Sequence, residues 1–238
     1  SCDRPKGQII ARLSDVRPDG TAMLISLGLL NLRHREGFEA KVNCVPGETF
    51  DAEIALDQSA YHLPAGHKLC LSLSTSYWPY CWPEGEAFSL SLSQGQIDIP
   101  LCPSTAIEMG FAPAPPVETR DMKLLSETHE SKGWQTMPDG TRVLTIKGDR
   151  GRREDVASGV ITDVSMQEVW SIHPDRPDSA KVEITWIRGF RRGNWRAHSK
   201  AYIAMQGTRD SFEISQRLEA WNGDEPAFDK SWAASVPR

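Results

Sequence analysis

The feature that most constrains the fold is a two-residue alternation of apolar and polar side chains in short segments separated by turn signals. Lys68–Ser74 and Phe88–Ser93 alternate in this way, and Phe50–Leu56 has the same period. Because successive side chains of a strand point to opposite faces of a sheet, this period indicates strands with one buried face. Pro18-Asp-Gly20 and Val45-Pro-Gly-Glu48 are typical of turns. The first hundred residues therefore predict β structure, in a β-sandwich or jelly roll.

The second half of the chain is expected to form an antiparallel sheet. Asn222-Gly223 favours a two-residue hairpin turn, because both central residues of such a turn adopt positive φ. One weak helix candidate is Val117–His129. The strands expected from β-branched and aromatic residues are Thr141–Ile146, Gln167–Ile172, Ala180–Ile187, Trp195–Met205 and Ser211–Trp221.

Prolines divide the chain into three parts. Four prolines lie between positions 103 and 116, and they favour extended backbone over helix. We therefore predict a partial jelly-roll β-sandwich at 1–103, a proline-rich linker at 104–118 and an antiparallel β region at 119–238. The sequence is compatible with one structural domain or with two.

Composition narrows the classes of partner. The net charge of -5 disfavours nucleic acid, and the basic stretch Arg188–Arg196 is interpreted as a turn between strands. No apolar run approaches the roughly 18 residues that span a membrane, so no membrane partner is expected. The five cysteines contain no C-x-x-C pair and are interpreted as buried thiols. Free thiols predict a cytoplasmic protein.

Catalytic and metal-binding patterns are lacking. No serine is flanked by glycines two positions away on both sides, so the sequence has no nucleophile elbow. His62 and His67 are five residues apart around a turn, which is not the spacing of a helical metal site, and no cofactor or metal is predicted. We interpret His67 as a hydrogen-bond donor that fixes the turn before the next strand.

Three aspartates near predicted turns have two interpretations. Asp15, Asp19 and Asp57 could supply paired carboxylates for glycosidase chemistry. Capping of turns, in which a carboxylate accepts backbone N–H bonds, explains the positions more simply. We predict the capping role.

The segment Tyr77-Trp-Pro-Tyr-Cys-Trp-Pro83 has the most unusual composition in the chain. Exposed rings of Tyr77, Trp78, Tyr80 and Trp82 could form a platform that stacks on sugars. Alternatively, they could form an aromatic wedge between this β region and a catalytic domain, because Trp and Tyr are enriched at such interfaces. These four residues and His67 are the candidate site residues.

Four motifs in order resemble the C-terminal β-domain of the CocE/NonD hydrolases, the group that contains cocaine esterase and the X-Pro dipeptidyl peptidases. That domain is a jelly roll of the galactose-binding-like type. Residues 119–238 resemble the C-terminal extension of longer members. The motifs are Ala11-Arg-Leu-Ser-Asp-Val-Arg-Pro-Asp-Gly20, Gly28-Leu-Leu-Asn-Leu-Arg-His-Arg35, Pro64-Ala-Gly-His-Lys-Leu69 and Ser74-Thr-Ser-Tyr-Trp-Pro-Tyr-Cys-Trp-Pro83.

The resemblance implies a non-catalytic region of a serine hydrolase that cleaves esters or amides, as an esterase, an acylase or an X-Pro dipeptidyl-peptidase-like enzyme. The family's catalytic triad lies in an upstream α/β-hydrolase domain, so no catalytic residue is assigned here. That domain is the expected partner, and the region would shape a wall of its active site. The resemblance favours the aromatic wedge, and it implies that the isolated chain self-associates. A stand-alone carbohydrate-binding module and an independent enzyme remain the alternatives.

Overall fold

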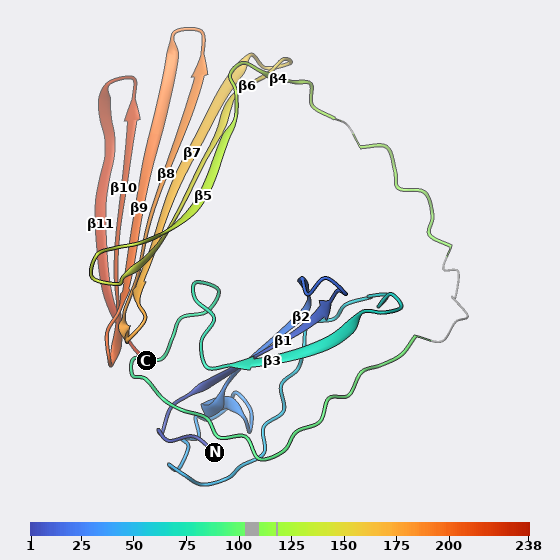
Figure 1. Ribbon diagram of the computed structural model, residues 1–238. Coiled ribbons are helices and arrows are strands. Elements are labelled where there is room, and N and C mark those ends of the chain that lie inside the picture. Colours follow the sequence, from blue (N-terminus) through green and yellow to red (C-terminus); the bar gives the residue numbers. More distant parts are fainter. Residues whose placement is uncertain (103–109, 118) are drawn as a thin grey trace.

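A computed structural model describes residues 1–102, 110–117 and 119–238. The described chain is all-β, as predicted, with one short 3-10 turn, η1 (Leu32–His34), and no α-helix. Its strands form two antiparallel sheets (Figure 1). A three-stranded sheet has the order β2-β1-β3, and an eight-stranded sheet contains β4 to β11.

The first sheet comprises β1 (Gln8–Val16), β2 (Ala22–Asn31) and β3 (Lys68–Ser74), with β1 at its centre. The predicted Pro-Asp-Gly turn joins β1 to β2. Gly20 adopts a φ of 84°, and the Asp19 carboxylate accepts a hydrogen bond of 2.9 Å from the backbone N–H of Thr21. The capping role predicted for Asp19 is therefore confirmed.

Two predicted strands are absent from the described structure. Neither Phe50–Leu56 nor Phe88–Ser93 belongs to a strand, and the second contributes only an isolated bridge between Leu90 and Cys2. Apolar side chains of both segments nevertheless pack on a cluster of buried residues around Cys2 and Leu32. The alternation predicted burial correctly for these side chains but not for Leu92, which is 63% exposed, and packing against a core does not require pairing with a neighbouring strand.

The second sheet is a meander in which each strand from β5 to β11 pairs with the next. The short strand β4 (Met122–Leu124) pairs with the last residues of β6, so the helix suggested for 117–129 is wrong. Pairing with β6 satisfies the backbone there. The remaining strands are β5 (His129–Thr136), β6 (Arg142–Asp155), β7 (Val160–His173), β8 (Arg176–Arg192), β9 (Trp195–Gly207), β10 (Ser211–Asn222) and β11 (Glu225–Pro237).

Alternation along these strands gives the second sheet two unlike faces. Paired residues of adjacent strands share a face, so a row of apolar side chains crosses the sheet on what we call the apolar face. This row consists of Trp170, Val182, Met205 and Ile214. The next residue along each of these strands points to the opposite face. That face carries a row of polar side chains, and we call it the polar face. This second row consists of Ser171, Lys181, Gln206 and Glu213.

Two further properties bear on the sequence predictions. Cys2 and Cys44 are buried free thiols, whereas Cys70 and Cys81 are free thiols that are partly buried. Within the described ranges, no helix has the length and apolar character needed to cross a membrane.

Candidate functional site

The aromatic segment that follows β3 packs against the second sheet of the same chain. The Trp78 ring lies edge-on against Trp170 of β7, with centroids 5.6 Å apart. The Trp82 ring contacts Phe212 of β10 in the same manner at 5.5 Å. Trp78 and Trp82 also contact each other at 5.0 Å. These edge-to-face contacts join the two sheets through rings.

The two tyrosines of the segment have different surroundings. The Tyr77 ring lies beneath the guanidinium of Arg12 on β1, 4.9 Å from its centroid. Tyr80 contacts Tyr77 at 5.4 Å and remains 65% exposed. The segment is therefore an interface on one side, and Tyr80 presents its aromatic surface to solvent on the other.

Arg238 follows the last residue of β11 at the chain end marked C in Figure 1, and its side chain contacts both the aromatic segment and the second sheet. Its Nη1 donates a hydrogen bond of 2.6 Å to the carbonyl oxygen of Pro83, and its guanidinium lies 4.2 Å from the centroid of the Phe212 ring. Gly207 permits this approach, because a Cβ at that position would overlap the Arg238 side chain. Burial lowers the pKa of the Arg238 guanidinium. An ion pair between Arg209 and Glu86 lies at the same junction.

His67 lies beside a buried carboxylate on the central strand of the first sheet. Its Nδ1 is 2.8 Å and 2.9 Å from the two oxygens of Asp15, and the Tyr61 hydroxyl donates a bond of 2.6 Å to the same carboxylate. Asp15 is only 1% exposed. It lies inside β1, where it holds two side chains, so the turn-capping role predicted for it is wrong.

This cluster changes the ionisation of two of its members. The hydrogen bond from Tyr61, with a smaller contribution from His67, lowers the pKa of the Asp15 carboxyl. The same hydrogen bond raises the pKa of the Tyr61 hydroxyl. The cluster connects β1 to the turn that precedes β3, and both of its partners hold Asp15 in the ionised state.

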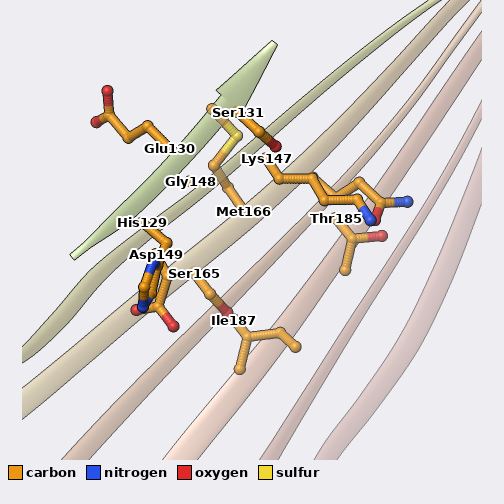
Figure 2. A pocket seen from close by; sticks show the side chains of 11 residues that line it. His129, Glu130, Ser131, Lys147, Gly148, Asp149, Ser165, Met166, Thr185 and Ile187 are labelled. Atoms are coloured by element: carbon orange, nitrogen blue, oxygen red, sulfur yellow. The ribbon is translucent and has the colours of Figure 1, made fainter. Parts of the chain in front are cut away.

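A hollow of about 640 Å³ lies on the polar face of the second sheet, over β5 to β8 (Figure 2). It brings together side chains that suggest hydrolytic chemistry, because His129, Asp149 and Ser165 are cross-strand neighbours. A catalytic triad requires the imidazole between the hydroxyl and the carboxylate. Here Asp149 lies between the other two, and its carboxylate accepts a bond from the Gly151 N–H. The hollow therefore lacks the order of groups that activates a serine.

Among residues 1–102, 110–117 and 119–238, no three or more His, Cys, Asp or Glu residues are grouped in a way that could hold a metal ion.

Sequence reasoning did not identify the partners of the predicted site residues. Strands were predicted over the segments that contain Trp170 and Phe212, but neither these residues nor Arg238 were predicted to contact the aromatic segment. Apolar residues at alternate positions of a strand predict that one face is buried, but they do not predict which residues pack against that face. Asp15 and Tyr61 were likewise brought to His67 by the tertiary fold.

Fold and site together define an all-β protein whose aromatic segment and last residue contact its second sheet. The model of the X-Pro dipeptidyl-peptidase C-terminal non-catalytic domain matches residues 1–138, more than half of the sequence, and the chain belongs to that family. The match includes the first sheet, the aromatic segment, β4 and β5. A search of curated proteins and a search of solved structures found no match.

Proposed function

We propose that the chain is the non-catalytic β region of a CocE/NonD-type serine hydrolase, an enzyme that cleaves ester or amide bonds by acyl transfer. In this role it packs against an α/β-hydrolase domain and shapes a wall of the active site. The observation that carries the proposal is the family match over residues 1–138. The sequence motifs resemble the same family, and neither the sequence nor the polar hollow supplies a serine nucleophile arrangement.

The extent of exposed surface supports a partner. The chain of 26.5 kDa exposes 16977 Å², whereas a folded monomer of that mass exposes about 10,700 Å². Part of the excess lies on the first sheet, where Leu69, Leu71 and Leu73 of β3 are each 41% exposed. These leucines pair with residues of β1 that include the buried Ala11 and Leu13, so they extend an apolar face. A second layer over this face would bury it.

The carbohydrate-binding alternative receives less support. Stacking on a sugar needs an accessible ring face. The rings of Trp78 and Trp82 already contact each other, Trp170 and Phe212, which leaves Tyr80 as the well exposed ring of the segment. The free thiols Cys2 and Cys44 are consistent with a reducing compartment, and we place the protein in the cytoplasm on that basis.

The test uses the product of the intact gene. Its mass is measured first, and it is then treated with a serine-directed fluorophosphonate. A product much heavier than 26.5 kDa that becomes labelled supports the proposal. A product of this mass that does not label removes the hydrolase assignment, and titration with oligosaccharides followed by Trp fluorescence then tests the alternative.

A matched pair of variants tests the packing role in the labelled product. Leu71→Asp places a charge on the exposed apolar row of β3, whereas Ser72→Asp places the same charge on the opposite face of the strand. We expect the first change to reduce hydrolysis about tenfold or more through misplacement of the active-site wall. Equal activity of both variants at equal folded content would contradict the packing role.

A further inference from the structure

The apolar face of the second sheet continues well beyond the point where the aromatic segment covers it. Near that contact Ala180 and Val182 of β8 are 0% and 5% exposed. Across β8 to β11, several large apolar side chains on the same face are 37% to 45% exposed. They include Phe190, Ile203, Leu218, Phe228, Trp232 and Val236.

The two faces of this part of the sheet differ in the partners of their polar and charged side chains. On the polar face, Arg217 binds Asp229 through two hydrogen bonds of 2.8 Å and 3.0 Å, and Tyr202 donates one to Glu183. On the apolar face, the cations of Arg188 and Lys230 lie over the rings of Trp186 and Trp232, at 5.9 Å and 5.2 Å from the ring centroids.

These cations lie against aromatic surface, so they leave the apolar face with little isolated charge. Burial of an unpaired charge would oppose covering by another protein, whereas a cation stacked on an indole keeps a favourable interaction as water is removed. The apolar face is thus suited to being covered.

The dimensions of the exposed part match a protein interface. Four adjacent strands with about ten residues each cover about 34 Å by about 19 Å. The projected area is about 650 Å², and side chains raise the accessible area above it. A stable interface of standard size takes about 800 Å² from each partner. A single partner with a complementary flat face is sufficient to cover this area.

The position of strands β8 to β11 in the sequence indicates which partner covers the apolar face. The family match ends at residue 138, whereas β8 to β11 span residues 176 to 237. The family match therefore does not extend to these strands. We propose that this face packs against the same face of a second copy of the chain, across a two-fold axis, to form a symmetric dimer.

Symmetry and sheet geometry favour this arrangement. Two-fold dimers use one self-complementary patch twice, and the cations Arg188 and Lys230 on this face lie over rings of their own strands. Two twisted sheets pack face to face with their strands about 30° apart, which gives a two-layered sandwich with an apolar interior. The inference is independent of the proposed function, because it concerns strands outside the matched region.

The test measures molar mass by light scattering during size exclusion over a range of concentrations. It is applied to the 238-residue chain and to the product of the intact gene. Trp232→Glu and Ser231→Glu form a matched pair, because both place a carboxylate on β11 but on opposite faces. We expect dimers for both wild-type proteins. Trp232→Glu should raise the dissociation constant about thirtyfold or more, whereas Ser231→Glu should change it little.

Other results overturn the proposal. A monomeric intact product would place the face against another domain of that product. Equal weakening by both variants would indicate pairing along the free edge of β11 in place of face packing. If circular dichroism shows that Trp232→Glu does not fold, Leu218→Gln and its neighbour Arg217→Gln replace the pair. Dimers of equal strength in these two variants would also overturn the proposal. Loss of fluorophosphonate labelling alone would leave the dimer intact.

Discussion

The indole of Trp78, just after the first sheet, lies edge-on against the indole of Trp170 in the second sheet, with ring centroids 5.6 Å apart. This contact and the neighbouring one between Trp82 and Phe212 connect segments that the sequence places in separate regions. The aromatic segment is therefore a joint within the chain.

Removal of the Trp78 ring should loosen this joint. We expect Trp78→Ala to lower the free energy of unfolding by about 2 kcal/mol or more, slightly below the range for fully buried tryptophans because the side chain is only half-buried. Tyr80→Ala, at a position 65% exposed, should change it by less than about 0.5 kcal/mol. Urea unfolding followed by near-UV circular dichroism measures both. Equal midpoints would refute the joint.

Arg238 should be needed for the same junction. Arg238→Ala removes the hydrogen bond to Pro83 and the stacking on Phe212, so residues 75–83 should be cleaved several-fold faster by a protease. Arg238→Lys should be intermediate, because an ammonium lacks the planar fork of the guanidinium. Arg192→Ala, at an exposed end of β8, is the control. Cleavage of Arg238→Ala at the wild-type rate would show that the contact does not hold the sheets together.

Asp15 should make stability depend on pH in the acid range. Its pKa is lowered in the folded state by Tyr61 and His67. The carboxylate therefore stabilises the fold fully above the unfolded value of about 3.9, and this contribution is lost as the pH falls below that value through the folded pKa.

The measurement compares thermal midpoints at pH 7 and at several values below 4. Asp15→Asn should have a lower midpoint than wild type at pH 7, and the difference should shrink as the pH falls. Asp98→Asn, at an exposed position, should follow the wild-type curve. A difference that stays constant with pH would mean that the Asp15 charge does not contribute.

Gly28 should be intolerant of a side chain because another segment crosses β2 there. A Cβ at this position would lie 2.5 Å from the carbonyl oxygen of Ala55 and 2.8 Å from Ile54. Gly28→Ala should therefore displace that segment and lower the thermal midpoint by several degrees. Gly133→Ala in β5 is the matched control, because a Cβ there meets nothing within 4 Å. Equal midpoints would show that the crossing segment moves away at little cost.

Much of the fold followed from local patterns. The alternation in Lys68–Ser74 predicted β3, and the runs at 195–205 and 211–221 lie within β9 and β10. The strand predicted at Phe88–Ser93 was wrong, since its side chains pack on the core while its backbone forms a single bridge. The hairpin predicted at Asn222-Gly223 implies a strand after it, but no bounds were predicted for β11, whose side chains are exposed along its whole length. The burial of one face of a strand leaves a periodic pattern in the sequence, whereas the identity of the strand that pairs with it leaves no such pattern.

The sequence by itself determined the all-β class, the Pro-Asp-Gly turn and the motifs of the family, because each depends on residues close together in the chain. Only the tertiary structure decided what lies against Trp78, which two side chains hold Asp15 and which strands leave an apolar face uncovered. These relationships join residues far apart in the sequence. Their energies depend on which surfaces the completed sheets bring together, and no local pattern records that choice.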